Sequence, residues 1–380
     1  MDALGDDTAV LASAASLDPA DAEHPIVDRE RVQSDFRTAL TGMLSGDRPH
    51  LFVYGDAGVG KSLLTRRLLD EHVDGDRQSV VIDCEDYGSA YGVAVALANV
   101  LAPEEPPLAR TGHSKATVLA QVDERLRAAG DTLVVLDSVD AVDAPGLLEQ
   151  LLDGIVAGGV ATICVASDES LRNDLPLAVR RRLCARELVL TPYDRDDVYR
   201  ILEQRASTAF REGALSPEVL DRCVTVVEST FDGDVGRGIR LLGFVALVAD
   251  EDGATQVTAD HVTHARDRLV SQRISDHLAD APRHRAGCLR AVHDCVTGRD
   301  EAPRIDALYE AYRVHCREDG VDPISKRGFH GHLRALRDAE IVTATSHRSG
   351  TPGHYYRYDL GVEPSAVQLA LAARASDGQA

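Results

Sequence analysis

The sequence contains no apolar run of the roughly 18 residues that a membrane-spanning helix needs, and its N-terminus lacks the basic-then-apolar pattern of a secretory signal. Its seven cysteines include no CxxC pair, which argues against a disulfide framework and against a zinc site. We therefore expect a protein with no membrane partner that works in a reducing cytoplasm. At 380 residues the chain is long enough for two or three domains.

Lysine and aromatic residues are also scarce. Only three of the 41 basic residues are lysine, which leaves 38 arginines, and aromatic residues make up 4% of the chain. With 62 acidic residues and a net charge of −21, the composition resembles that of cytoplasmic proteins from salt-accumulating halophiles. An ordinary acidic mesophilic protein is the alternative. In molar salt the Debye length falls to ~3 Å, so the negative charge does not by itself exclude a nucleic-acid partner.

A phosphate-binding loop follows a short apolar segment at residues 51–54. The sequence GDAGVGKS, residues 55–62, has the complete GxxxxGK[ST] pattern, and a helix-forming stretch comes after it. In this pattern backbone N–H groups surround the phosphates of ATP or ADP, Lys61 reaches the β- and γ-phosphates, and the hydroxyl of Ser62 holds Mg²⁺. The other predicted nucleotide contacts are Gly58, Val59, Gly60 and Leu63. A chance glycine turn is the alternative, but the order of strand, loop and helix argues against it.

A second apolar stretch, TLVVLD at residues 132–137, ends in a carboxylate. Asp137 stands where a nucleotide-binding sheet places a magnesium ligand, although an aspartate that only caps a turn is the alternative. The stretches SVVID, ATICVAS and ELVL alternate with helical patterns. Strands that alternate with helices predict an α/β fold with a parallel sheet, whose ligand lies at the carboxyl ends of the strands.

Several further segments occur in an order that is more specific than the loop. These are HPIVDRERVQSDFRTALTGMLSGDRPHLFVYGDAGVGKS, PYDRDDVYRILEQRA, DGDVGRGIRLL and LYEAYRVHCREDGVDPISKRGFHGHLRALRDAEIV. In this order the chain resembles the AAA+ initiator ATPases of archaea, which are related to the eukaryotic origin-recognition and cell-division-control proteins. The resemblance implies an AAA+ P-loop parallel sheet with a helical lid and a C-terminal winged-helix domain.

The same resemblance, which extends over residues 22–370, implies the limits of the domains. The first 23 residues contain six acids and no base, which is typical of a flexible tail. We expect an acidic flexible tail at 1–21, the AAA+ nucleotide-binding domain at 22–192, the lid at 193–276, the winged-helix DNA-binding domain at 283–370 and a second tail at 371–380.

Two residues beyond the loop are carried over from the family. Tyr193, in PYDRDD, matches the tyrosine that packs beside the adenine, and Arg205, in EQRA, matches an arginine that contacts the nucleotide. From the residues alone, a surface tyrosine and a solvated helix arginine would be the simpler interpretations. The match to the family favours the two functional roles.

Four positions that act on the γ-phosphate depart from the family pattern. Ser138 follows Asp137 where the family has glutamate, and Ser167 stands where it has a polar sensor that is usually asparagine. The lid motif Gly-Asp-x-Arg has Gly236 in place of its arginine, with Arg237 one residue late, and Ala178 replaces an arginine offered to a neighbouring subunit, although residues 180–182 are all arginine. Hydrolysis needs a positioned water and stabilised transition-state charge, whereas binding does not. We expect weak hydrolysis with binding retained, so Asp137, Ser138 and Ser167 are weak catalytic candidates.

The C-terminal region concentrates the positive charge. Residues 324–357 contain six basic and two acidic residues, in a pattern of helix, turn, helix and two strands. Ser325 is a predicted N-cap, and the helix after it would enter the major groove of DNA. The predicted DNA contacts are Lys326, Arg327, His330 and Arg334 on this helix, with Arg348 and His354 on the wing. A winged helix that binds protein through a solvated basic face is the alternative.

These features favour an ATP-binding replication initiator that recognises duplex DNA at origins and helps to recruit the replicative helicase. The replicative helicase and other copies of the initiator are the further partners expected, in a cytoplasmic, nucleoid-associated setting. A nucleotide-gated DNA-binding regulator without an origin of its own is the alternative, and an active motor or helicase loader is a third hypothesis that Ser138 and Gly236 disfavour.

Overall fold

The computed structural model describes residues 9–19, 21, 26–45, 50–72, 78–130, 132–143, 146, 148, 160–167, 170–279, 281–298, 301–348 and 354–377. The chain divides into two compact units. One, here called the sheet unit, comprises residues 12–212 and 220–239. The other, here called the winged-helix unit, comprises residues 1–11, 213–219 and 240–380. No helix in the described part of the chain is long and apolar enough to cross a membrane.

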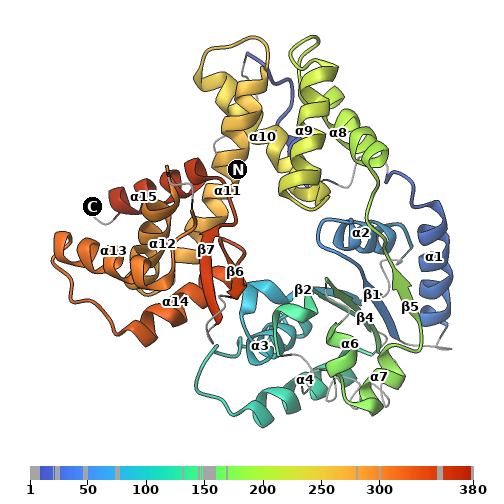
Figure 1. Cartoon of the computed structure of the whole chain (residues 1–380). Helices are drawn as coiled ribbons and strands as arrows, with labels where there is room; N and C mark the ends of the chain where they lie inside the picture. The colour runs from blue at the N-terminus through green and yellow to red at the C-terminus, as the bar shows by residue number, and fades with distance from the viewer. Residues whose placement is uncertain are drawn as a thin grey trace. The chain divides into compact units, whose positions relative to one another are not determined.

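The sheet unit is built on five parallel strands in the order β2-β3-β4-β1-β5, which confirms the predicted α/β fold (Figure 1). The strands are β1 (His50–Tyr54), β2 (Gln78–Asp83), β3 (Thr132–Asp137), β4 (Ala161–Ala166) and β5 (Glu187–Val189). Strands β3 and β4 are buried along their whole length. This burial explains why both strands are continuous runs of apolar residues, as is usual for strands covered on both faces.

Successive residues of each strand point to opposite faces of the sheet, and each face has its own core. Leu51 and Val135 pack on one face against α1 (Glu30–Leu44) and α2 (Lys61–His72). Phe52 and Leu136, the next residue in each strand, pack on the other face with α3 (Ala90–Leu101), α4 (Lys115–Ala129), α6 (Ser170–Asp174) and α7 (Leu177–Leu183). Because helices cover both faces of the sheet, the loops meet at the two ends of the strands.

The four helices that follow the sheet in the chain are α8 (Arg195–Ala209), α9 (Pro217–Thr230), α10 (Val235–Glu251) and α11 (Ala259–Ala279). They lie in the region where a helical lid is expected. The boundary between the two compact units falls within α9 and α10, inside the range 193–276 where the lid is predicted.

Both predicted tails differ from the structure where it describes them. At the N-terminus, η1 (Ala15–Leu17) lies on α8, Leu17 is fully buried, and the Ala12 N–H donates to the carbonyl of Ala209 at 2.7 Å. At the C-terminus, α15 (Pro364–Asp377) continues through most of the predicted tail. The acidic composition of the first segment predicted a tail, although the segment also contains the apolar residues that anchor it. Residues 1–8, 20 and 378–380 lie outside the described part.

The winged-helix unit contains α12 (Arg283–Val296), α13 (Ile305–Glu318), α14 (Lys326–Asp338) and the antiparallel strands β6 (Val342–Arg348) and β7 (His354–Leu360). The Ser325 hydroxyl accepts the Gly328 N–H at 3.2 Å, which confirms the predicted N-cap of α14. Tyr312 and Phe329 are fully buried, with ring centroids 5.2 Å apart. The predicted winged helix is therefore present, with its own aromatic core.

The last helix, α15, returns to the helix that precedes the winged helix. The Ser365 hydroxyl donates to a carboxylate oxygen of Asp267 on α11 at 2.5 Å, and the Arg374 guanidinium donates to the Leu278 carbonyl at 2.5 Å. Helix α15 also packs against α12. The winged helix is thus attached to α11 by side-chain contacts as well as by the chain itself.

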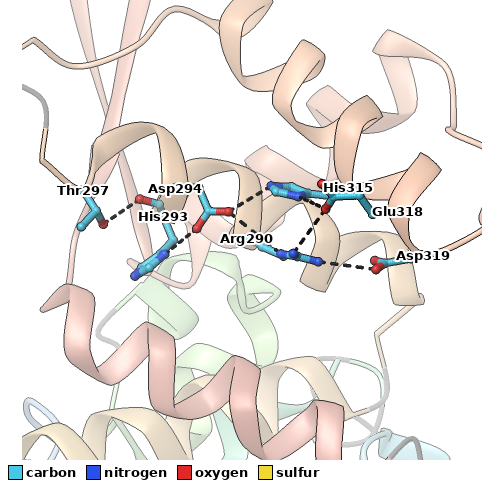
Figure 2. Close-up of polar contacts among 7 residues, drawn as sticks. All are labelled: Arg290, His293, Asp294, Thr297, His315, Glu318 and Asp319. Carbon is cyan, nitrogen blue, oxygen red and sulfur yellow. Dashed lines mark hydrogen bonds and ion pairs between the residues drawn. The ribbon is translucent and has the colours of Figure 1, made fainter.

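A polar network joins α12 to α13 on the same unit (Figure 2). The Asp294 carboxylate lies 2.9 Å from Nδ1 of His293 and 3.1 Å from Nε2 of His315, whose side chain is largely buried. Arg290 reaches Glu318, the last residue of α13, and Asp319, which follows it, each at 3.5 Å. Asp294 is therefore hydrogen-bonded to His293 and lies within ion-pair distance of His315 on the neighbouring helix.

Replacing Asp294 by alanine is expected to lower the free energy of unfolding by about 1 kcal/mol, because His293 loses its hydrogen-bond partner and the buried His315 ring loses the carboxylate beside it. Urea unfolding monitored by circular dichroism measures this change. The exposed Asp322 gives a matched control, since Asp322→Ala removes the same charge from the same unit. Equal stability of the two variants would contradict a structural role for the network.

Candidate functional site

The phosphate loop connects β1 to α2, which begins at Lys61, as the sequence predicts. Gly58 and Gly60 have φ angles of 72° and 87°, in the left-handed region that glycine adopts without strain. A Cβ on Gly58 would also lie 2.0 Å from a carboxylate oxygen of Asp234, at the start of α10. The backbone amides of Ser62 and Leu63 lie in the first turn of α2, where N–H groups have no partner inside the helix. This loop has the conformation expected of the predicted phosphate-binding loop.

Lys61 is folded back onto the loop. Its side chain is buried, with 6% exposed, and Nζ donates to the carbonyls of Gly55 and Asp56, both at 2.7 Å. Burial lowers the pKa of Lys61, and the carboxylates of Asp140 and Asp137 oppose that shift. The Lys61 ammonium therefore donates to two oxygen acceptors, and phosphate oxygens are acceptors of the same kind.

Ser62 and Asp137 form the pair predicted to hold magnesium. The Ser62 hydroxyl donates to Oδ1 of Asp137 at 2.9 Å, and the same oxygen accepts the Ser138 N–H at 3.0 Å. Burial raises the pKa of Asp137, whereas the bond from Ser62 lowers it. A hydroxyl and a carboxylate side by side are the oxygen donors that Mg²⁺ prefers, so the two residues fit the ion. No group of three or more His, Cys, Asp or Glu in the described residues forms a further metal site.

The two serines that depart from the family pattern lie at the ends of adjacent strands. Ser138 has a φ of 50°, and the Ser167 N–H donates to Oδ2 of Asp140 at 2.9 Å. Asp140, in η3 (Val139–Ala141), was not among the predicted site residues. The Asp140 carboxylate raises the pKa of Lys61, and its effect is larger than the effect of the Asp137 carboxylate. The signal for Asp140 in the sequence was its position three residues after Asp137, but a turn of unknown geometry separated them.

Tyr193 lies beside the phosphate loop. Its hydroxyl is 3.6 Å from the position that a Cβ on Gly60 would take. The guanidinium of Arg29, another residue that the sequence did not single out, lies 4.0 Å from the centroid of the Tyr193 ring and is almost fully buried. The ring is thus fixed on one face, which suits a residue that packs a base, and its contact with adenine remains a prediction.

Arg205 is buried in α8, with 3% exposed, and its guanidinium is held by the N-terminal segment. It donates to the carbonyls of Ser16 and Asp21 at 3.3 and 2.9 Å, and to the Asp21 carboxylate at 3.2 Å. Burial lowers the pKa of Arg205, and the acids of that segment oppose the shift. The structure thus gives Arg205 an anchoring role that the sequence did not predict, and a nucleotide contact remains a prediction.

The other two positions that depart from the family pattern are the lid motif and Ala178. Arg237 pairs with Asp234, since its Nε lies 3.3 Å from the carboxylate and its backbone N–H donates to it at 2.9 Å. Gly236 offers no side chain to a phosphate. Ala178 is exposed on α7, next to the turn that carries Arg180, Arg181 and Arg182.

The predicted DNA-contacting residues of α14 lie together on its exposed side. Phe329, Leu333 and Leu336 are buried in the core. The exposed residues are Lys326, Arg327, His330 and Arg334. Lys326 forms an ion pair with Asp306 of α13. Arg348 and His354 are register partners at the ends of β6 and β7, but their side chains and the turn between them lie outside the described residues.

Comparison with known proteins places the chain in a family. The ORC1-type DNA replication protein 8 of Halobacterium salinarum is 33% identical over 366 residues, which cover 91% of this chain and 92% of that protein. The chain belongs to the family of ORC1-type DNA replication proteins. A second member of the ORC1 type, protein 15 of Haloarcula marismortui, is 31% identical over 352 residues, covering 89% of this chain and 86% of its own. Both organisms are halophilic archaea, which agrees with the composition.

The parts of this ORC1-type chain match separate family descriptions. Residues 44–173 match an AAA domain, residues 199–267 the Cdc6 AAA+ ATPase-type lid domain, and residues 276–370 the C-terminal winged-helix domain of CDC6. The structure of the Aeropyrum pernix ORC1 protein in complex with DNA has the same fold, with a TM-score of 0.84 at 22% identity, over 98% of this chain and 99% of that one. These matches confirm the predicted AAA+, lid and winged-helix architecture of a replication initiator.

Proposed function

We propose that this ORC1-type protein binds ATP, with Mg²⁺, on the phosphate loop and recognises duplex DNA at replication origins through α14. The observation that carries the proposal is that Lys61, Ser62 and Asp137 are assembled as a nucleotide site requires. Bound magnesium would be held by Ser62 and Asp137 and would neutralise charge on the β- and γ-phosphates. The exposed basic face of α14 supports the DNA contact, as does the DNA-bound structure of the Aeropyrum pernix ORC1 protein.

In this proposal ATP is chiefly a conformational ligand, because the positions that act on its γ-phosphate are altered. Ser138 lacks the carboxylate that would position water, and Arg237 is paired with Asp234. The DNA-bound protein would then help to recruit the replicative helicase, together with other copies of itself. A nucleotide-gated regulator without its own origin is the second candidate, which the altered positions favour. Chromatin immunoprecipitation that places the protein at promoters instead of origins would select that candidate.

The nucleotide carried by the purified protein tests the proposal most directly. We expect bound adenine nucleotide after purification in molar salt, with most of any ATP still intact after prolonged incubation with magnesium. Chromatography of the released nucleotide before and after incubation measures both quantities. Failure of the wild-type protein to bind ATP or ADP in this buffer would overturn the proposal, and complete conversion within minutes would make it an active ATPase.

A further inference from the structure

Gly331 lies near the middle of α14, on the side of the helix that faces away from the core. Helix α14 runs from Lys326 to Asp338, so helical residues precede and follow this glycine. Gly331 is exposed, whereas Phe329 and Leu333, two positions away on either side, are buried. Glycine is one of the least favourable residues inside a helix and alanine is the most favourable, because glycine loses the most backbone freedom. The glycine therefore weakens α14, and some other property of the position must offset that loss.

The packing of the chain does not account for this glycine. A Cβ on Gly331 would meet no heavy atom within 4 Å in the described part of the chain, and its φ lies outside the left-handed region. Gly328, three residues earlier, differs because its Cβ would lie 3.3 Å from Cδ1 of Ile324. Gly320 also has open space around it, but its φ is 64°. Neither of the reasons that explain Gly328 and Gly320 applies to Gly331.

Two arginines flank Gly331 on the exposed face. Residues three or four positions apart are neighbours on a helix surface, which places Arg327 and Arg334 on either side of Gly331. Both arginines are exposed, and neither forms a hydrogen bond or an ion pair with another residue of the described chain. Lys326 of the same helix, in contrast, pairs with Asp306. The exposed face of α14 thus has a gap at its centre, with a guanidinium group on each side.

We propose that Gly331 is a specificity-determining residue for duplex DNA, at which the backbone of α14 comes against the edges of the bases. The major groove of B-DNA is about 12 Å wide and a helix with its side chains is about 10–12 Å across, so a helix nearly fills the groove. The side chain at the centre of the inserted face then limits how closely the helix approaches the bases. Because Gly331 has none, Arg327 and Arg334 reach the base edges beside it.

This inference rests on the proposed function, since it requires α14 to enter the groove of duplex DNA. Replacing Gly331 by alanine adds one methyl group and no charge. The methyl group has space in the protein alone, so it should stabilise the helix. In the complex the same methyl group would occupy the space of the base edges. The effects on stability and on DNA binding are therefore opposite in sign, whereas replacing a glycine that the fold requires would weaken both.

The test uses the full-length protein in molar salt and a fluorescent duplex that the wild-type protein selects from a random-sequence pool. We expect Gly331→Ala to raise the Tm by about 2 °C, because alanine favours the helix. The same variant should bind the selected duplex about tenfold more weakly, because an extra methyl group overpacks a close contact. The slope of log affinity against log salt should not change, since no charged contact to phosphate is lost.

Ala373→Gly is the matched control. Ala373 is exposed within α15 of the same unit, so this change should lower the Tm by a similar amount and leave the affinity for the duplex within about twofold. A lower Tm in Gly331→Ala, or wild-type affinity in that variant, would overturn the inference while leaving DNA binding by α14 intact. Equal weakening of binding by Ala373→Gly would overturn it as well.

Other outcomes separate this inference from the proposed function. If the wild type binds no duplex, or if the double alanine variant of Arg327 and Arg334 binds as well as the wild type, the proposed DNA contact of α14 is wrong and this role of Gly331 is wrong with it. If the double variant loses affinity and Gly331→Ala does not, the proposed function stands and only the role of Gly331 is contradicted.

Discussion

Replacement of Lys61 by alanine is expected to lower the affinity for ATP by about 100-fold, because two charge-assisted contacts to phosphate are lost and each contributes about 1.5 kcal/mol or more. The buried ammonium has the carbonyls of Gly55 and Asp56 as its present partners, at 2.7 Å each, and these hold it at the mouth of the loop. Equilibrium binding of a fluorescent ATP analogue in molar potassium chloride measures the change.

Lys115 provides the control for this experiment. It is an exposed residue at the first position of α4, in the same unit, so Lys115→Ala removes the same charge far from the loop in the sequence. We expect the affinity of Lys115→Ala to stay within about twofold of the wild type, because exposed charges are screened in molar salt. Equal binding by Lys61→Ala and Lys115→Ala would show that the loop does not hold a nucleotide.

Replacing Arg327 and Arg334 together by alanine should lower the affinity for duplex DNA by about 100-fold, since each arginine that reads a base edge contributes about 1–3 kcal/mol. Both side chains are exposed on α14, on the side opposite the buried Phe329 and Leu333. Fluorescence anisotropy with labelled duplexes, at several salt concentrations, measures the loss and the number of phosphate contacts together.

Arg317 is the matched control for the DNA experiment. It is exposed on α13 of the same unit, and its Nε donates to the Arg313 carbonyl at 3.3 Å. If α14 is the reading helix, Arg317→Ala should change the affinity by less than about threefold. Undiminished binding by the α14 double variant would favour the alternative, a winged helix that binds protein.

The predicted features that the structure shows are those set by local order along the chain. The loop of residues 55–62 lies between an apolar strand and a helix, so its conformation follows from neighbouring residues. Asp137 ends a run of buried apolar residues, and Ser325 stands one residue before a helix with an apolar stripe. Each of these signals is complete within about ten residues, and the overall architecture followed from their order.

The parts that the sequence did not predict depend on contacts between distant segments. Asp83 lies opposite Asp137 only because β2 is the neighbour of β3 and the two strands share a register. Arg29 lies over Tyr193, and Arg205 is held by Asp21, because the N-terminal segment returns to the start and end of α8. In a chain with so many acids and arginines, no pair of this kind is distinctive until the fold brings its members together.

The attachment of α15 to α11 has a mechanical consequence. A single short connection between α11 and α12 would normally allow the winged helix to rotate relative to α11. Here Ser365 and Arg374 of α15, which follows the winged helix, also bind Asp267 and Leu278 of α11. The winged helix is therefore attached to α11 both through the chain and through α15, and two attachments restrict rotation more than one does. A change in the orientation of α11 would therefore carry the winged helix with it, because the two are held together at both ends of the module.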